Sequence, residues 1–349
     1  YKRQVRDLQF AMGQHSARGR FVHVYLNGMY WGIYNVQERP AAPFQEAYFG
    51  GDKDTDWDVI NSGSAIDGNS AAWSRALRDS RQVRTPEAYE AFQQQVDVVN
   101  LADYMLLNFY IGNTDWDGHN WMAVKRRTNG PFRFYAWDSE FAISLPPSNT
   151  AVGESAERQI INANRTGQNN GNGPSGIHQQ LTRSEEYRML FADRVQKHFF
   201  NGGVLTPEVA TGLFLDRAAE IDRAVVAESA RWGDFRRDVS PGRWRSDQFD
   251  LFTRDEHYLP QQEFIVVRYL PVRTDIVLEQ LRRRNLYPDL AAPQLGQHGG
   301  RVLPGTSLSI AAEQGIIYFT LDGTDPRQVG GAVAEAARQY TDSLVLTEN

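Results

Sequence analysis

The sequence contains no cysteine in its 349 residues, which excludes disulfide bonds, thiolate metal sites and cysteine nucleophiles. It also lacks an excess of positive charge, because its net charge is −6 and its pI is about 5.7. No electrostatic signature of nucleic-acid binding is therefore present. No apolar run approaches the ~20 residues of a transmembrane helix. Neither an initiator methionine nor a signal peptide is visible, so we expect part of a longer product.

The composition that remains is ordinary for a soluble globular protein, with 41% hydrophobic and 23% charged residues. Such a chain can bury a core of normal size, and its length suggests roughly two domains. Amphipathic helical stretches occur together with strand-like runs, which indicates an α+β protein.

The most informative stretch is residues 113–141, in which two strand-like runs flank Asn129-Gly130. Asn-Gly between β-prone runs is a strong hairpin signal because both residues tolerate positive φ. A hairpin brings its two open ends together, so polar groups that flank its strands should share one small volume. These groups are Asp115, Asp117, His119 and Asn120 before the first strand, and Asp138 and Glu140 after the second.

Clustered carboxylates repel one another, and a divalent cation is the usual compensation. Oxygen atoms of Asp and Asn suit Mg²⁺ or Mn²⁺. The offset from Asp115 to Asn120 matches the base and metal-binding Asn of a kinase catalytic loop, with Asp138 as a second metal-binding Asp. A hairpin with solvated acidic ends explains the same residues about equally well.

The other side chains of this stretch have ordinary interpretations. His119 is expected to be hydrogen-bonded structure rather than a base. Trp116, Trp121 and Trp137 could stack on an adenine, although packing is the more frequent role of tryptophan.

Helical periodicity and capping residues predict the remaining elements. Thr85 and Asn100 are expected N-caps, and Thr182 opens a capping-box pattern. Pro271 must kink or divide the last helix. The expected helices span residues 3–13, 43–49, 71–81, 86–100, 101–112, 182–200, 207–232 and 261–285, with a further hairpin around Asn27-Gly28, a strand at 57–60 and a loop or linker at 165–176.

Three blocks resemble the CotH kinase family, named after spore coat protein H: RGRFVHVYLNGMYWGIYNVQERP, GGDKDTDWDVINSG and the DWDGHN…WDSEF hairpin. Their order and spacing match over roughly residues 1–285. The resemblance implies an atypical protein-kinase-like fold with a small β-rich lobe and a helical lobe. It also implies an enzyme that uses ATP and a divalent metal to phosphorylate Ser or Thr on exported or coat proteins, at an extracellular or cell-surface location in a bacterium.

Carried onto this chain, the resemblance makes Asp115 the catalytic residue. Asn120 and Asp138 become metal ligands, with Asp117 as a further metal candidate. Glu38 becomes the acidic partner of the phosphate-binding Lys or of the metal.

One departure concerns the phosphate-binding Lys, which we expect at the end of the DVI strand, where this chain has Asn61. Asn61 can donate a hydrogen bond but cannot neutralise the α- and β-phosphates. Lys53, Lys125, Arg18 or Arg39 could substitute for the Lys. The residues expected at the nucleotide are thus Glu38, Arg39, Asn61 and Lys53.

Two rival hypotheses remain. The chain could be a pseudokinase or structural binding module of a large extracellular protein, which Asn61 favours. A metal-dependent hydrolase could use the same acid cluster, but no second basic or His-rich group is visible to activate water.

The C-terminal stretch carries a second resemblance. GGRVLPGTSLSI and IIYFTLDGTDPRQVGG resemble the chitobiase/β-hexosaminidase C-terminal domain, whose hallmark is a YTLDGTDPR turn. This implies a small all-β, immunoglobulin-like module over residues 288–349, complete or in part, after a kinase-like domain at 1–287. Such modules accompany secreted polysaccharide-active proteins, so a polysaccharide or neighbouring domains are expected partners besides the protein substrate.

Overall fold

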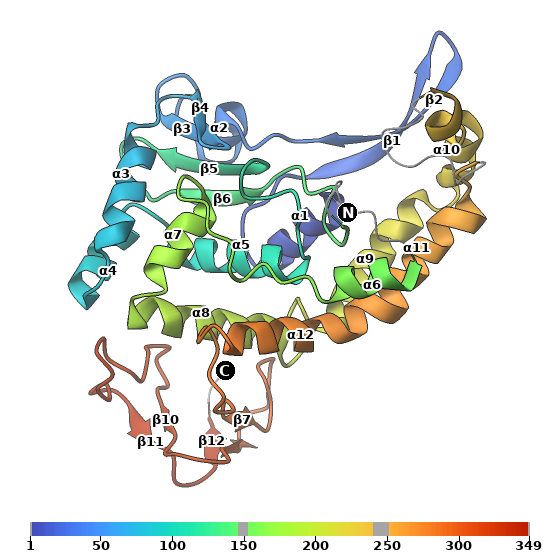
Figure 1. The fold of residues 1–349 in the computed structure, drawn as a ribbon. Helices are drawn as coiled ribbons and strands as arrows, with labels where there is room; N and C mark the ends of the chain where they lie inside the picture. Colours follow the sequence, from blue (N-terminus) through green and yellow to red (C-terminus); the bar gives the residue numbers. More distant parts are fainter. Residues whose placement is uncertain (1, 146–152, 240–250, 348–349) are drawn as a thin grey trace.

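The structure is a computed structural model that describes residues 2–145, 153–239 and 251–347, and it combines helices with antiparallel strands (Figure 1). This agrees with the expected α+β class. The helices are α1 (Lys2–Ala11), α2 (Ala42–Phe49), α3 (Ala71–Asp79), α4 (Pro86–Gln93), α5 (Val98–Tyr110), α6 (Gly153–Ile161), α7 (Pro174–Leu181), α8 (Glu185–Phe199), α9 (Pro207–Ile221), α10 (Ala224–Trp232), α11 (Leu259–Glu263) and α12 (Leu270–Arg282).

The strands fall into two groups. Those of the main body are β1 (Gly19–Leu26), β2 (Met29–Gln37), β3 (Trp57–Asn61), β4 (Ser64–Asp67), β5 (Trp121–Arg126) and β6 (Arg133–Ala136). The short C-terminal strands are β7 (Gln294–Leu295), β8 (Thr306–Leu308), β9 (Ile310–Ala311), β10 (Tyr318–Phe319), β11 (Arg338–Gln339) and β12 (Leu344–Leu346).

An antiparallel sheet of order β4-β3-β5-β6 forms the centre of the body. Successive side chains of a strand point to opposite faces, and both faces of the sheet are largely buried at β3, β5 and β6, whereas β4 is mostly exposed. Ile60, Ala123 and Phe134 join the large core around α5, whereas Val59 and Tyr135 join a smaller cluster with α2. The sheet is thus held between two apolar layers.

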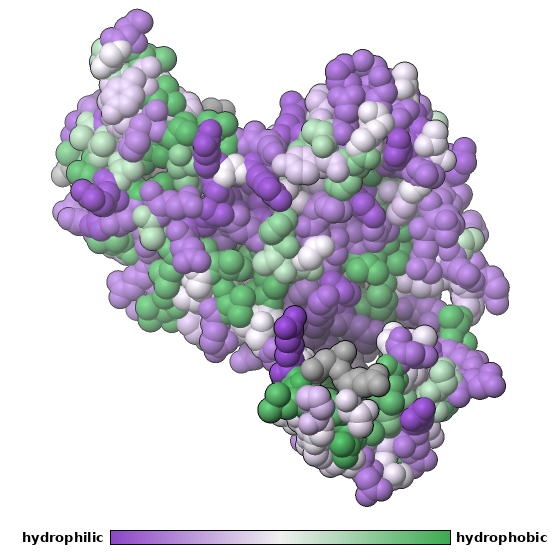
Figure 2. All heavy atoms as spheres, turned by 180° about the vertical axis from the view of Figure 1, so that it is seen from behind, coloured by the Kyte–Doolittle hydropathy of each residue, from purple (hydrophilic) through white to green (hydrophobic). Residues whose placement is uncertain are grey.

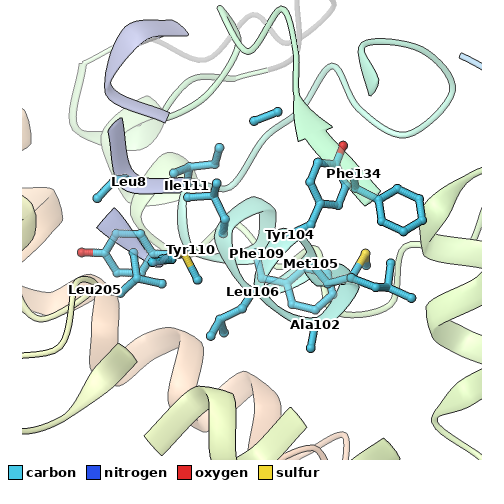
Figure 3. Packing of buried hydrophobic residues seen from close by; sticks show 14 of the residues in the cluster. Leu8, Ala102, Tyr104, Met105, Leu106, Phe109, Tyr110, Ile111, Phe134 and Leu205 are labelled. Atoms are coloured by element: carbon cyan, nitrogen blue, oxygen red, sulfur yellow. The ribbon is translucent and has the colours of Figure 1, made fainter. Parts of the chain in front are cut away.

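Helix α5 lies at the centre of the large core. Its side chains are buried from Asn100 to Tyr110, as its nearly continuous apolar sequence predicts. Figure 3 shows Leu8, Phe134 and Leu205 packed around the side chains of this helix. The element that leads into Asp115 is therefore rigidly supported.

Two side chains from helices form hydrogen bonds with the backbone at the free edge of strand β6. The backbone N–H of Phe134 donates to Asn100 Oδ1 at 2.6 Å. The Gln9 amide donates to the Phe134 carbonyl at 2.9 Å and accepts from the Ala136 N–H at 2.9 Å. Because buried backbone groups must be paired, these amides replace a further strand.

That role of Asn100 corrects its predicted function as an N-cap. The cap of α5 is Asp97, whose side chain accepts from the Asn100 N–H at 3.0 Å. The predicted cap Thr85 is confirmed, since its Oγ1 accepts from the Ala88 N–H at 3.3 Å. Local capping preference decided the role of Thr85, whereas pairing with β6 decided the role of Asn100.

Other predicted boundaries also changed. The helix predicted from Thr182 begins at Glu185, because Thr182 terminates α7 by donating its N–H to the His178 carbonyl at 3.0 Å. The predicted 207–232 helix is divided into α9 and α10, and the predicted 261–285 helix comprises α11, a π-helical turn at Phe264–Tyr269 and α12. Helix α6 and strand β4 were not predicted, and the 165–176 loop is shortened by the start of α7.

Both predicted hairpins are present, but their turns differ. Asn27 and Gly28 have φ of 51° and 80°, so the β1–β2 turn follows the Asn-Gly rule. In the second hairpin only Gly130 has positive φ, at 94°. The next residue, Pro131, has no N–H for the ladder, and Phe132 pairs with Gln95 and Asp97 instead. The second loop is therefore longer than a two-residue turn.

The C-terminal strands form three two-stranded pairs, and Figure 2 shows this segment as a separate lobe. It contacts the body through Arg327, which donates to both carboxylate oxygens of Glu186 at 2.7 and 3.1 Å. No helix among residues 2–145, 153–239 and 251–347 is long and apolar enough to cross a membrane.

Candidate active site

The site begins where α5 ends. Ile111 is the C-cap of α5, and Gly112 follows it with φ of +58°. This left-handed conformation suits glycine and terminates a helix. An added Cβ at Gly112 would lie 3.1 Å from the Ala163 side chain, so the helix end is also closely packed. The chain then enters the loop that carries Asp115.

Backbone pairing joins this loop to the segment after β6. The N–H of Thr114 donates to the Phe141 carbonyl at 3.3 Å, and the Thr114 hydroxyl donates to the same oxygen at 3.2 Å. The N–H of Ile143 donates to the Ile111 carbonyl at 2.8 Å. These bonds bring the predicted acidic groups from both ends of the hairpin together.

The backbone is bent at both open ends of the hairpin. Trp121 pairs with Ala136 as the last register partners of β5 and β6, and Asn120 and Asp138 lie just beyond them. Both have positive φ, of 63° and 50°. Residues other than glycine adopt this region infrequently, and such residues cluster at functional sites. The same bend thus occurs at both predicted metal ligands.

Both carboxylate oxygens of Asp115 have partners. Asn120 Nδ2 donates to Asp115 Oδ2 at 2.8 Å and to the Asp115 carbonyl at 3.0 Å. His119 Nε2 makes a short hydrogen-bond contact with Oδ1. The His119 side chain is 61% exposed, whereas that of Asp115 is 23% exposed. Asp115 is therefore oriented by Asn120 and contacted by a largely exposed histidine.

Asp138 and Glu140 share a cation from α1. The Lys2 ammonium forms a short contact with Asp138 and lies 3.0 Å from Glu140 Oε2. Burial alone would raise the pKa of Asp138, but the hydrogen bond from Lys2, the interaction with Glu140 and the charges of Lys2 and His119 lower it overall. The influence of His119 places Asp138 in the same electrostatic cluster as Asp115.

The residues at the hairpin opening fit a hard divalent cation by their donor chemistry. Within the described ranges, no group of three or more His, Asp or Glu side chains is arranged to hold a metal ion. Mg²⁺, however, keeps several waters and often takes one or two carboxylates together with substrate phosphates. The Asp138 carboxylate and the Asn120 amide oxygen have the donor chemistry that such a partial set requires.

Asp117 lies in different surroundings from the other acidic residues. Its side chain is fully buried, and Oδ2 accepts a short hydrogen bond from Ser175 in the first turn of α7. Its carbonyl accepts from Asn170 Nδ2 at 2.5 Å and from Trp121 Nε1 at 3.2 Å. Oδ1 is buried and finds no hydrogen-bond partner in the part of the chain that the structure describes. Its role as a metal ligand stays a prediction.

We expect Asp117→Asn to stabilise the protein more at pH 8 than at pH 5. Burial raises the pKa of Asp117 from 3.8 to about 7. The folded state thus binds this proton more tightly, and the stability that the proton contributes is lost as the pH rises from about 4 to about 7. The gain at pH 8 should reach up to about 4 kcal/mol, measured by urea unfolding at both pH values. An equal change in stability at both pH values would contradict a raised pKa for Asp117. The control is Asp54→Asn, which makes the same change at an exposed carboxylate.

The four residues predicted at the nucleotide lie on different elements. Asn61 ends β3 opposite Met122, two residues after Asn120, so it borders the site. The Arg39 guanidinium lies 5.7 Å from the ring centre of Trp137, the residue before Asp138. Glu38 accepts from the Tyr48 hydroxyl at 2.6 Å and from the Arg18 N–H at 2.8 Å. Lys53 pairs with Asp54 at 2.7 Å in the acidic loop.

Two of the three tryptophans pack rather than line the site. Trp116 and Trp121 are 5% and 1% exposed, and the Trp116 ring N–H donates to the Tyr104 hydroxyl at 2.8 Å. Trp137 is partly buried and packs against the smaller apolar cluster. Only Trp137 therefore combines partial exposure with a position next to Asp138.

Sequence reasoning missed Lys2 and Ser175 at the site. Lys2 is separated from Asp138 by more than one hundred residues, and it lies just before the helix predicted at 3–13, so it had no local signal. Ser175 lies in a Gly/Asn-rich stretch that was expected to be a loop or linker. Neither contact has a short-range pattern, so only the fold brings these side chains to the acidic cluster.

Comparison with known proteins adds one finding. A family model described as CotH kinase protein matches residues 5–250. That range contains Glu38, Asn61, Asp115, Asn120 and Asp138. No curated protein matches the sequence.

Proposed function

Because the chain belongs to the CotH kinase family, we propose that it is an atypical protein kinase that transfers the γ-phosphoryl group of ATP to a Ser or Thr hydroxyl of a protein. Mg²⁺ or Mn²⁺ is the proposed metal. The observation that carries the proposal is the group formed by Asp115, Asn120 and Asp138 at the open end of one hairpin. A bacterial cell-surface or extracellular location belongs to the same proposal.

Asp115 acts on the attacking hydroxyl. Its carboxylate is held by Asn120 and lies at the partly exposed edge of the site. The substrate hydroxyl would replace His119 at Oδ1, donate its proton to that oxygen, and attack the γ-phosphorus. The bond to the β-phosphate oxygen then breaks and ADP leaves. Positioning and a correctly placed acceptor are the main contributions of the protein.

Asn120 and Asp138 would hold the divalent cation. When bound, such an ion neutralises charge on the β- and γ-phosphate oxygens. Asn120 Nδ2 already donates to Asp115, which leaves the amide oxygen as the ligand atom. The lowered pKa of Asp138 keeps this carboxylate ionised at neutral pH, as a metal ligand requires.

Replacing Asp138 with Ala should remove metal-dependent nucleotide binding. Asp138 provides the only carboxylate in the proposed ligand pair, so we expect the affinity for MgATP to fall at least about tenfold. Calorimetric titration of ATP with Mg²⁺, and again with Mn²⁺, measures this. Asp54→Ala changes an exposed acid outside the site and is the matched control. Unchanged binding by Asp138→Ala would rule out this role.

A parallel assay with radiolabelled ATP separates the remaining functions. Binding with label transfer to the protein or to a Ser/Thr substrate supports a kinase. Binding without transfer to any substrate tried would favour the pseudokinase, for which Asn61 is the motivating residue. Absence of binding with either metal would favour a structural module.

The C-terminal segment is proposed as a chitobiase-like, immunoglobulin-like module over residues 288–349, after a kinase-like domain at 1–287. Its antiparallel strand pairs and the position of Tyr287 support this division. The Tyr287 ring stacks on Phe200 at 5.8 Å between ring centres, so the body extends to this residue. Limited proteolysis should cut first between residues 288 and 293, and resistance there with cleavage elsewhere would contradict the division.

A further inference from the structure

Helix α1 presents two basic side chains to the acidic end of the hairpin. Lys2 and Arg6 are four residues apart, so they lie on one face of the helix. The Lys2 ammonium contacts Asp138 and Glu140. The helix packs against α5, α9 and β6 (Figure 1). Its position is thus set by the same elements that position the site.

Arg6 is a buried cation with unused hydrogen-bonding capacity. The residue is 5% exposed, and Nη1 donates to Gln37 Oε1 in a short hydrogen bond. Nη2 is buried and has no hydrogen-bond partner among the residues described. Burial and the charge of Arg3 lower the pKa of Arg6, while the charges of Asp7 and Asp138 oppose this change. Arg6 lies one helical turn from Lys2, whose ammonium contacts Asp138, so this second cation lies on the side of α1 that faces the acidic end of the hairpin.

A buried guanidinium N–H without an acceptor is costly unless a ligand completes it. The guanidinium group favours carboxylates and phosphates because its donors lie in one plane. Kinase sites need cations at the phosphates, and Asn61 provides none at the end of β3. Arg6 and Lys2 supply two positive charges at this acidic site.

We propose that Lys2 and Arg6 bind the phosphate groups of ATP, so that α1 supplies the charge that Asn61 does not. This inference rests on the proposed kinase function. In the nucleotide complex, Lys2 leaves Asp138 for a phosphate oxygen, and the free N–H of Arg6 donates to a second one. Asp138 is then available to the metal.

A different role for Lys2 predicts the opposite result. If Lys2 only neutralises Asp138 and Glu140, it competes with the divalent cation. Removing its charge would then leave the affinity for MgATP unchanged or increase it. The sign of the effect on nucleotide affinity therefore distinguishes a phosphate ligand from a competing counter-ion.

The test compares Lys2→Gln, Arg6→Gln and Arg3→Gln in the complete chain. Arg3 is the matched control because it lies on the same helix, over the Phe21 ring at 5.5 Å. Calorimetry measures binding of MgATP, MgADP and adenosine. We expect at least about tenfold weaker binding of both nucleotides by the first two variants, within twofold for Arg3→Gln, and unchanged binding of adenosine.

The outcomes separate this inference from the proposed function. Wild-type protein that binds no nucleotide overturns both. Wild-type protein that binds, with Lys2→Gln and Arg6→Gln binding equally well or better, overturns only the role of α1. An equal loss of nucleotide affinity in Arg3→Gln also overturns it. The loss would then come from the lower net positive charge of α1 and not from contacts of Lys2 and Arg6 with phosphate. Thermal unfolding reports whether Arg6→Gln is folded. If that variant does not fold, Lys2→Gln alone provides the test, because the Lys2 side chain is partly exposed.

Discussion

Replacing Asp115 with Asn is expected to reduce phosphoryl transfer by about 10²–10⁴-fold, with little change in MgATP affinity. The amide cannot accept the proton of the attacking hydroxyl. It is nearly the same size as the carboxylate and can still pair with Asn120, whose Nδ2 donates to Asp115 Oδ2 at 2.8 Å. The measurement is the rate of ³²P transfer from ATP, with calorimetric titration on the same preparation.

The control for this variant is Asp54→Asn, which makes the same chemical change on a side chain that is 75% exposed. Its transfer rate should stay within twofold of the wild type. Transfer by Asp115→Asn within about threefold of the wild type would remove Asp115 from the chemical step. A parallel loss of nucleotide binding would instead indicate that the substitution disturbed the hairpin end.

Replacing Arg273 with Met is expected to destabilise the protein by about 3–5 kcal/mol. Arg273 is completely buried, and its guanidinium donates to carbonyls at the ends of two helices. Two belong to α5, those of Phe109 at 2.6 Å and Tyr110 at 2.7 Å. Two lie at or after the end of α6, those of Ile161 at 2.7 Å and Ala163 at 2.8 Å.

A positive group at a helix C-terminus also opposes the partial negative charge there. Methionine fills similar space but donates no hydrogen bond, so buried carbonyls lose partners. Urea unfolding followed by far-UV circular dichroism measures the loss. Arg283→Met, at a side chain that is 75% exposed near the end of the same helix, should change stability by less than about 0.5 kcal/mol. A cost below 1 kcal/mol for Arg273→Met would show that solvent replaces these bonds.

Arg273 also connects stability with the site. The α5 carbonyls that it holds lie five or six residues before Asp115, and Gly112 turns the chain between them. Loosening this end should therefore reduce catalytic positioning in any Arg273→Met molecules that remain folded.

Much of the site was predictable because its information is local. Two strand-like runs and the acidic residues beside them predicted that Asp115, Asn120 and Asp138 would meet at one hairpin end, and the register of β5 and β6 agrees. The apolar sequence of α5 predicted its burial. Resemblance of three blocks predicted the family, which the match over residues 5–250 shows.

Contacts between distant residues were not predictable. Asn100 resembled an N-cap, but its side chain pairs with β6. The hydrogen bond from Ser175 to the buried carboxylate of Asp117 had no local signal either, and the role of Asp117 as a metal candidate stays a prediction. Thr182 resembled a helix start, but it terminates α7. For Asn100 and Thr182, a local preference of modest size was outweighed by pairing a polar group in the core.

The sequence by itself determined the hairpins, the central buried helix and the acidic residues at the hairpin end, because strand alternation, helical period and turn residues act over a few positions. The tertiary structure decided which charges meet those acids. Lys2 reaches Asp138 from α1, and Arg273 reaches the end of α5 from α12. Buried polar atoms must find partners wherever the packed chain places them, and no local pattern records that choice.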